Sequence, residues 1–331
     1  MAHGNPGTVV AAGSKVKLVH SLLKRAGQLV GRNKLSILIY HQVVKDIDPM
    51  RPDNPTADEF RWHMQLLRDY FNPISLAKAA QHLRDRDLPA NSVCITFDDG
   101  YLNNLQVAQP ILETFSIPAT VFVATGFCNG SNMWNDRLID LVGNPHLTTL
   151  HLNALDMGSV KVSSWESRGK LVDKILPDLK YQEYCQRERI IDALYLENGA
   201  QEAPRKMMSQ KEIALLAQKG VDIGAHTVDH PILKSLPAEE QRRQIAQSKE
   251  LLENVTGFPV TGFAYPNGKP GSDYDEATLQ IVKETGFDYA VSTTGGISTP
   301  DTSSYELNRF TPWDKNPVKF HLRMLRNIMG F

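Results

Sequence analysis

The sequence is poor in cysteine, and its cysteines follow none of the spacings that bind metals or form disulfide frameworks. Only Cys94, Cys128 and Cys185 occur among the 331 residues. Their odd number, their wide separation and the lack of a CxxC pair argue against a disulfide framework and against a thiolate zinc site. We expect all three to be small, buried, apolar side chains.

Long apolar runs and clusters of a single charge are missing as well. No stretch approaches the ~18 apolar residues of a membrane helix, and residues 1–30 lack the continuous apolar segment of a secretory signal. We therefore expect a cytoplasmic protein, with a periplasmic or extracellular location as the alternative if a leader has been lost. The 36 Lys and Arg residues are matched by 37 Asp and Glu residues without a dense basic run, which argues against a nucleic-acid partner.

What the sequence does contain is an alternation of strand and helix patterns, with enough apolar residues (41%) for a core. Short apolar runs predict strands at 35–40, 92–97, 118–125, 221–227, 260–266, 289–294 and 305–310. Amphipathic patterns predict helices at 57–70, 102–115, 210–220, 237–254, 275–285 and 318–328. This alternation predicts an α/β fold with a parallel sheet and helices outside it, either an open doubly wound sheet or a closed barrel.

Two segments fall outside the alternation. Residues 1–34 are expected to be an N-terminal tail or a peripheral helix. Residues 35–331 form the main unit, which is interrupted at about 128–208 by a polar stretch with helical pieces such as 181–196. We expect this stretch to be an insertion packed over one face of the main unit, not an independent domain. The oligomeric state is left open.

Two neighbouring carboxylates follow the strand predicted at 92–97. In Thr96-Phe97-Asp98-Asp99-Gly100-Tyr101 they lie at the C-terminal end of that strand, where parallel α/β folds build their sites. Two partly buried carboxylates side by side are costly unless they share a cation or a proton. A solvated turn through Gly100 would explain the same residues, so this motif alone leaves both interpretations open.

Two histidines follow a later strand, the one predicted at 221–227. His226 and His230 are four residues apart in Gly224-Ala-His-Thr-Val-Asp-His-Pro231, and neutral imidazole is the commonest nitrogen ligand of divalent transition metals. Two imidazoles and one carboxylate would leave coordination positions open for water and substrate, as a catalytic metal requires. The pattern therefore predicts a metal site.

TFDDGY followed by HTVDHP resembles the two motifs of the polysaccharide deacetylase family, carbohydrate esterase family four, which shares the chitooligosaccharide deacetylase homology domain. The resemblance covers roughly residues 35–315. It implies an irregular (β/α) barrel of about seven strands, which favours the closed barrel over the open sheet. It also implies Asp98 as the general base. Asp99, His226 and His230 would hold a divalent ion, with Zn²⁺ expected first and Co²⁺ or Ni²⁺ as alternatives.

Two further segments, Ile39–Val43 and Phe263–Gly268, are similar to the exopolysaccharide-associated branch of the family. Many relatives carry an Arg in the later motif that orients the base. The residue here is Ala264, and Arg309 in the last predicted strand is the candidate replacement. The family's C-terminal Leu-x-His, which supplies the general acid, is not recognisable. His321 is expected to be an ordinary helix residue, and His41 is the candidate acid.

The resemblance also implies contacts with an acetylated glycan. The backbone N–H of Tyr101 would stabilise the oxyanion, and a Trp near the site can stack on a sugar ring. The segment that begins at Trp134 resembles a Trp-x-Asp motif of this branch. The predicted substrate contacts are Tyr101, Trp134, Asp136, Tyr265, Pro266, Arg309 and Trp313.

The implied activity is that of a hydrolase for carbon–nitrogen bonds other than peptide bonds, which removes N-acetyl groups from an amino-sugar-containing glycan. A divalent ion activates water, Asp98 accepts the proton, and His41 protonates the leaving amine. A glycosidase using Asp98 and Asp99 is disfavoured, because neighbouring strand residues point to opposite faces while its carboxyls must face each other at about 5 to 9 Å. A non-catalytic glycan-binding relative and an amidase or imidase for a small non-sugar amide stay open.

Overall fold

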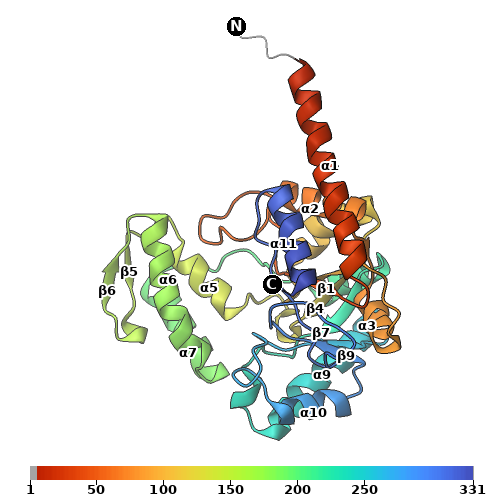
Figure 1. Cartoon of the computed structure of the whole chain (residues 1–331). Coiled ribbons are helices and arrows are strands. Elements are labelled where there is room, and N and C mark those ends of the chain that lie inside the picture. The colour runs from red at the N-terminus through yellow and green to blue at the C-terminus, as the bar shows by residue number, and fades with distance from the viewer. Residues whose placement is uncertain (1–5, 331) are drawn as a thin grey trace.

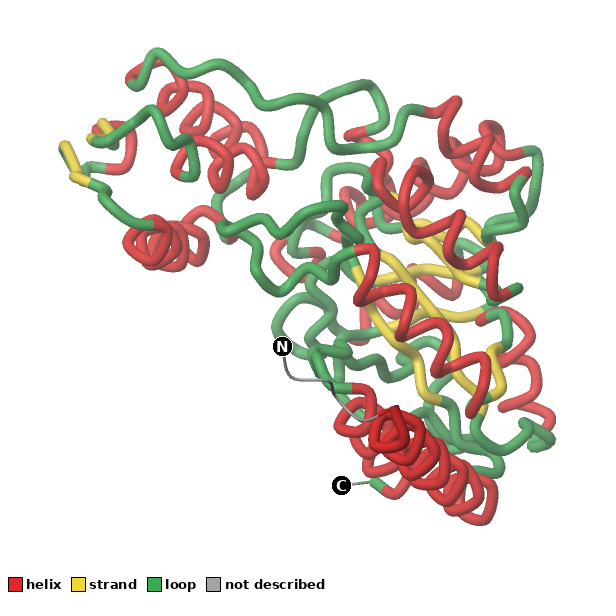
Figure 2. The backbone as a smooth tube through the Cα atoms, turned by 90° about the horizontal axis from the view of Figure 1, so that it is seen from above, coloured by secondary structure: helices red, strands yellow, loops and turns green. Residues whose placement is uncertain are grey.

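A curled parallel sheet forms the centre of this computed structural model, which describes the backbone of residues 6–330 and the side chains of residues 16–330. Its six main strands follow the order β1-β3-β4-β7-β8-β9, and the short β2 pairs with β3. The strands are β1 Ser36–Tyr40, β2 Asn72–Pro73, β3 Ser92–Phe97, β4 Ala119–Val123, β7 Asp222–Ala225, β8 Gly262–Ala264 and β9 Tyr289–Val291. Every pairing in this sheet is parallel. Figure 2 shows the sheet curving between its helices, which confirms the predicted irregular (β/α) barrel.

The segment 305–310, predicted as the last strand, is not a regular strand. Leu307 forms one parallel bridge with Val291 of β9, and Phe310 forms one with Leu38 of β1. Because the segment crosses from one partner strand to the other, neither pairing extends into a ladder. It spans the gap between β9 and β1 and carries Arg309 between its two bridges.

Helices cover the outside of the sheet, and alternate strand residues face two different apolar clusters. In β3, Val93, Ile95 and Phe97 pack with the outer helices. Cys94 instead belongs to a second cluster, together with the buried face of α3. The helices of the barrel are α2 Ala57–Tyr70, α3 Leu76–Asp85, α4 Gln109–Phe115, α8 Gln210–Gln218, α9 Ala238–Thr256, α10 Glu276–Glu284 and α11 Pro317–Met329.

Capping boxes open two of the barrel helices. The Thr56 hydroxyl accepts a hydrogen bond from the Glu59 amide, and the Glu59 carboxylate accepts one from the Thr56 amide, at the start of α2. The same reciprocal pair opens α8 at Ser209. The helix predicted at 102–115 differs from expectation, because it begins as a π-helical turn, Asn104–Ala108, before α4. Such turns are frequent beside functional sites.

Residues 6–30 form the long helix α1 (Pro6–Val30), which packs against α11 and projects beyond the barrel (Figure 1). His20 of α1 meets His321 of α11, with 2.8 Å between their Nδ1 atoms. His321 is buried in this contact between helices. Leu18, Leu22 and Leu29 of α1 are exposed. Within residues 6–330 no helix combines the length and apolar character that crossing a bilayer requires.

The insertion lies beside the barrel and has an apolar cluster of its own (Figure 1). It contains α5 Trp134–Val142, β5 Thr149–His151, β6 Ser159–Lys161, α6 Trp165–Lys180 and α7 Tyr184–Glu197. β5 and β6 pair antiparallel in a separate two-stranded sheet. The sequence shows no strand pattern in this segment. Strands of three residues are too short to show the alternation of apolar and polar residues. The remaining helical elements are single turns of 3₁₀ helix at Thr125–Phe127, Asn153–Leu155 and Leu233–Ser235.

Gly224 of β7 allows a close approach inside the barrel, two residues before His226. A Cβ at this position would lie 2.3 Å from Cδ1 of Phe122 and 3.1 Å from the carbonyl oxygen of Gly262. We expect Gly224→Ala to lower the free energy of unfolding by about 1–3 kcal/mol, because the buried Phe122 ring must shift. Urea denaturation measures this change.

The matched control is Gly169→Ala in α6, where a Cβ would meet nothing within 4 Å. The same substitution there is expected to raise stability by about 0.5–1 kcal/mol, because alanine loses less backbone entropy in a helix. Equal stability of the Gly224→Ala variant and the wild-type protein would contradict the close packing at this strand.

Candidate active site

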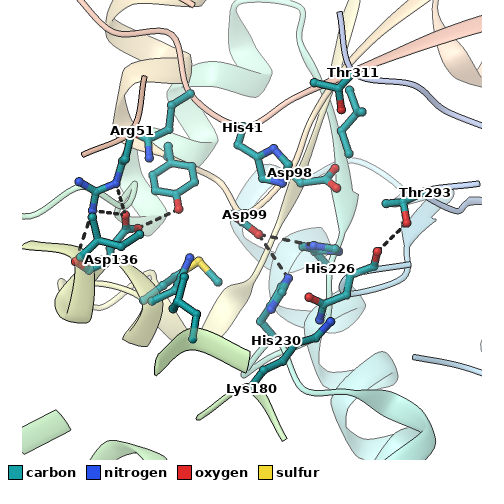
Figure 3. A pocket seen from close by; sticks show the side chains of 18 of the residues that line it. His41, Arg51, Asp98, Asp99, Asp136, Lys180, His226, His230, Thr293 and Thr311 are labelled. Carbon is teal, nitrogen blue, oxygen red and sulfur yellow. Dashed lines mark hydrogen bonds and ion pairs between the residues drawn. The ribbon is translucent and has the colours of Figure 1, made fainter. Parts of the chain in front are cut away.

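The carboxyl ends of the barrel strands open into a cavity of about 930 Å³. The barrel contributes His41 after β1, Asp98 and Asp99 after β3, and His226 and His230 after β7. The insertion supplies the facing wall. Because strand ends of one parallel sheet lie at the same edge, motifs far apart in the sequence meet here (Figure 3).

Asp99, His226 and His230 converge on one point. One ligand atom from each lies within 4.8 Å of the other two, and both Nε2 atoms are 3.5 Å from Oδ1 of Asp99. The backbone conformation contributes to this convergence. Asp99 and His230 both adopt left-handed conformations, with φ of 73° and 52°. Such conformations cost energy in residues other than glycine and concentrate at functional sites.

The chemistry of these three donors fits a divalent metal ion. Oδ1 of Asp99 is buried, and among the described residues nothing donates a hydrogen bond to it. Nδ1 of His226 donates to the carbonyl oxygen of Ala264 at 2.7 Å, which leaves its Nε2 free to bind an ion. Burial holds the pKa of His230 well below its usual value, so its ring is neutral at pH 7. Burial also raises the pKa of Asp99, so a nearby cation is needed to stabilise its ionised form.

Asp98 is turned to a different partner, the guanidinium of Arg309. Nη1 of Arg309 donates to Oδ1 of Asp98 at 2.7 Å and Nη2 donates to Oδ2 at 2.8 Å. Burial would raise the pKa of Asp98, but the charge of Arg309, together with His226 and His41, lowers it to about 2. Asp98 is therefore ionised at neutral pH. Each carboxylate oxygen keeps a second lone pair with which to accept a proton.

Arg309 is itself held in place, with only 1% of its side chain exposed. Its Nε donates to the carbonyl oxygen of Ser292 at 2.9 Å, and its Nη1 donates to Oγ1 of Thr96 at 3.3 Å. These contacts exist because the crossing segment 305–310 carries Arg309 into the gap between β9 and β1. The structure thus pairs Asp98 with the arginine that the sequence offered as its partner.

His41 lies at the cavity beside Asp98, and its side chain is exposed (Figure 3). The π-helical turn fixes its backbone, because Nδ2 of Asn104 donates to the carbonyl oxygen of His41 at 2.9 Å. Among the described residues none forms a hydrogen bond with the His41 ring. The imidazole is therefore available to a substrate in the cavity.

Tyr101 and Asp136 are linked to each other and to an arginine that sequence reasoning missed. The Tyr101 hydroxyl donates to Oδ2 of Asp136 at 2.8 Å, and Nη2 of Arg51 donates to Oδ1 of Asp136 at 2.7 Å. This network ties the loop after β1 to α5 of the insertion. Both oxygens of Asp136 accept hydrogen bonds, so Asp136 holds Tyr101 and Arg51 in position at the cavity. No described residue accepts a hydrogen bond from the backbone N–H of Tyr101.

The other predicted substrate contacts divide into two groups. Trp134 and Trp313 line the cavity, and Trp313 is 59% exposed. Tyr265 and Pro266 do not line it, because both are buried and the Tyr265 ring stacks on Tyr274 with 3.8 Å between ring centroids. The structure therefore does not bring Tyr265 and Pro266 to the site.

Several lining residues carried no signal in the sequence. They come from loops or from the insertion, where no motif marks them: Arg51, Lys180, Arg187, Thr293 and Thr311. A surface arginine and an active-site arginine look alike in a sequence. Only the position of the insertion over the strand ends distinguishes them.

The sequence matches a family model and a curated relative. The model of the family described as polysaccharide deacetylase matches residues 85–167 and 178–290, which include both motifs. A curated Bacillus subtilis protein, described as "Putative polysaccharide deacetylase YxkH", is 25% identical over 278 residues. That match covers 83% of this chain and 70% of the relative.

Solved structures share the fold. The Streptococcus pyogenes deacetylase PplD in complex with acetate has a TM-score of 0.60 and 21% identity, covering 88% of this chain and 98% of that chain. IcaB from Ammonifex degensii has a TM-score of 0.58 and 18% identity, covering 88% and 97%. The BpsB deacetylase domain from Bordetella bronchiseptica has a TM-score of 0.51 and 18% identity, covering 84% and 96%. At these identities the likeness establishes the fold alone, an irregular (β/α) barrel.

Proposed function

Since the chain belongs to the polysaccharide deacetylase family, we propose that it hydrolyses N-acetyl groups on the amino sugars of a polysaccharide or glycan, with a divalent metal ion as cofactor. Family membership supports a glycan deacetylase in general. The finer proposal depends on one observation: a set of two histidines and one carboxylate lies beside a second carboxylate that is ionised and held by an arginine.

Asp99, His226 and His230 would hold the ion, and Zn²⁺, Co²⁺ and Ni²⁺ all suit nitrogen and oxygen donors of this kind. When bound, such an ion would polarise the acetyl carbonyl and lower the pKa of the attacking water towards about 7.

Asp98 accepts the proton of the attacking water in this proposal. Its pKa of about 2 makes it a weak base, so it works only on water that has become more acidic than bulk water. Arg309 fixes the direction in which the free lone pairs of Asp98 point. The N–H of Tyr101 is free to donate to the oxyanion that develops on the acetyl group.

The leaving group needs a proton, because an amide anion is far too basic to depart unaided. His41 is the proposed donor, since its ring is exposed to the cavity and lies near Asp98. Trp313 lines the cavity and is 59% exposed, so it offers a ring surface on which a sugar can stack, whereas the ring of Trp134 is buried and covered by Arg187. In this proposal Asp98 accepts a proton, His41 donates one, and Arg309 positions Asp98.

Acetate release tests the proposal. Metal-loaded protein is incubated with N-acetylglucosamine oligomers, with O-acetylated glycans and with small non-sugar amides. We expect acetate from the N-acetylated oligomers, with an equal amount of new free amino groups. Acetate from the O-acetylated glycans alone, or from the small amides alone, would contradict the proposed bond specificity. Binding of glycans without acetate release would identify a non-catalytic relative.

Removal of the ion is expected to lower the rate of acetate release by about 10³-fold or more, since Lewis-acid stabilisation amounts to several kcal/mol. Added Zn²⁺, Co²⁺ or Ni²⁺ should restore the rate. The thermal unfolding midpoint should fall on removal as well, because an ion that binds only the folded state stabilises it. Full activity after exhaustive chelation and dialysis would contradict the metal dependence.

A further inference from the structure

Arg187 is a buried cation that none of the described residues neutralises. It lies in the first turns of α7, lines the cavity, and is only 3% exposed. No described residue accepts a hydrogen bond from its guanidinium, and its Nε is fully buried without a partner. A buried charge without a partner is costly, so a ligand that supplies the missing charge would stabilise it.

The other arginines buried in the described structure are all satisfied. Arg309 pairs with Asp98. Arg168 donates to the carbonyl oxygens of Val142 and Leu147. The lack of partners is therefore specific to Arg187, the arginine that faces the cavity from the insertion.

Three carboxylates influence Arg187 electrostatically, but each has another partner. Glu188 accepts from Arg137 at 2.8 Å, Asp229 accepts from Gln244 at 2.7 Å, and Glu183 accepts from the Gln186 amide at 3.1 Å. None of the three forms an ion pair with Arg187. The nearby acids thus leave its hydrogen-bond donors unused.

Two aromatic rings hold the guanidinium without neutralising it. Its Cζ lies 4.7 Å from the ring centroid of Trp134 and 5.8 Å from that of Tyr184. Contact with ring faces orients a guanidinium and leaves the N–H groups at its edge free. Trp134 also lines the cavity, so this contact holds the arginine at the cavity wall.

Lys180 adds a second cation on the same wall. It is the last residue of α6, lines the cavity, and lies on the His230 side of the site (Figure 3). Its Nζ is 3.5 Å from Oδ1 of Asp273, a loose contact beyond hydrogen-bond length. The insertion thus brings two cations, Arg187 and Lys180, to the cavity, and its acidic residue there, Asp136, is already paired with Arg51.

We propose that Arg187, assisted by Lys180, binds an oxyanion carried by the glycan, either a carboxylate or a phosphate group on a sugar near the one that is deacetylated. The proposal rests on the proposed function and narrows its substrate class to anionic N-acetylated glycans. Arginine suits this role because its planar N–H groups match both carboxylate and phosphate oxygens.

The test compares three N-acetylated oligosaccharides of equal length: one neutral, one with a uronic acid, and one with a phosphate. We expect the wild-type protein to prefer one of the two anionic substrates. In Arg187→Gln, the ratio of kcat/KM for that substrate to kcat/KM for the neutral one should fall by about 10- to 100-fold, mainly through KM. If the ratio falls for the uronic-acid substrate, the bound oxyanion is a carboxylate. If it falls for the phosphorylated substrate, the bound oxyanion is a phosphate.

Arg189→Gln on the same helix is the matched control, because Arg189 is exposed and does not line the cavity. It removes the same charge and should leave the ratio unchanged. An equal ratio in the wild-type protein and Arg187→Gln would overturn the proposal while the proposed function stands. Absence of acetate release from all three substrates would instead contradict the proposed function.

Equilibrium binding separates the two claims further, since it needs no catalysis. Metal-free wild-type protein should bind the preferred anionic oligosaccharide about 10- to 100-fold more tightly than Arg187→Gln does. The unfolding midpoint of Arg187→Gln should be equal to or higher than that of the wild-type protein, because the variant no longer buries an unpaired charge. The proposal would be overturned if Arg187→Gln had a lower unfolding midpoint and bound neutral and anionic oligosaccharides with equally weakened affinity. Arg187 would then serve to hold Trp134 and Tyr184 in place.

Discussion

Asp98→Asn is expected to lower kcat for acetate release by about 10²- to 10⁴-fold, the usual contribution of a general base. An amide cannot accept a proton from water at neutral pH, although its oxygen can still accept a hydrogen bond from Arg309. The substitution changes no side chain of the proposed ligand set. Initial rates at saturating metal and substrate measure the effect.

Metal binding is the control for this variant. Because Asp99, His226 and His230 are unchanged, Asp98→Asn should still bind one divalent ion per chain. Loss of activity together with retained metal would assign the defect to proton transfer. A kcat near the wild-type value would show that another group accepts the proton.

Arg309→Met is expected to lower the free energy of unfolding at pH 7 by about 3–5 kcal/mol, since it leaves the buried Asp98 carboxylate without a counter-charge. The kcat for acetate release should fall as well, because nothing then fixes the direction of the carboxylate. Urea denaturation at pH 7 measures the stability. Unchanged stability would show that the ion pair contributes little.

The loss of stability should depend on pH. Arg309 holds the pKa of Asp98 at about 2, below its ordinary 3.8. A depressed pKa stabilises the folded state above pH 3.8, and this contribution disappears as the pH falls towards 2. The difference between the wild-type protein and Arg309→Met should therefore be largest near neutral pH and should shrink below about pH 4.

The double variant Asp98→Asn/Arg309→Met separates stability from catalysis. It leaves no unpaired charge, so it should be more stable than Arg309→Met alone. Its activity should stay as low as that of Asp98→Asn. A double variant as unstable as Arg309→Met would show that packing around Arg309, not its charge, stabilises the fold.

Local patterns in the sequence predicted the parts of the molecule that depend on neighbouring residues. Strand–helix alternation predicted the barrel, and the Asp98–Asp99 pair and the His226–His230 pair each follow a strand. Since parallel strands end at one edge, the two motifs could be expected to meet. The structure places the atoms of Asp99, His226 and His230 within 4.8 Å of one another.

Parts that depend on distant packing were harder to predict. The segment 305–310 has the apolar pattern of a strand, but it bridges two strands and so forms no ladder. Tyr265 lies in a motif near the site, yet it points into a stack with Tyr274. Arg187 reaches the cavity because the insertion lies against the strand ends, and Arg51 reaches it from the loop after β1; no short-range pattern encodes either position.

Titration of metal-free protein with Zn²⁺ tests the central claim most directly, because it counts ions and compares ligands in one measurement. One tightly bound ion per chain is predicted for the wild-type protein and for Asp98→Asn, and a large loss of affinity is predicted for Asp99→Asn and for His230→Ala. Equal affinity in all four proteins, or no bound ion in the wild-type protein, would contradict the assignment of these side chains.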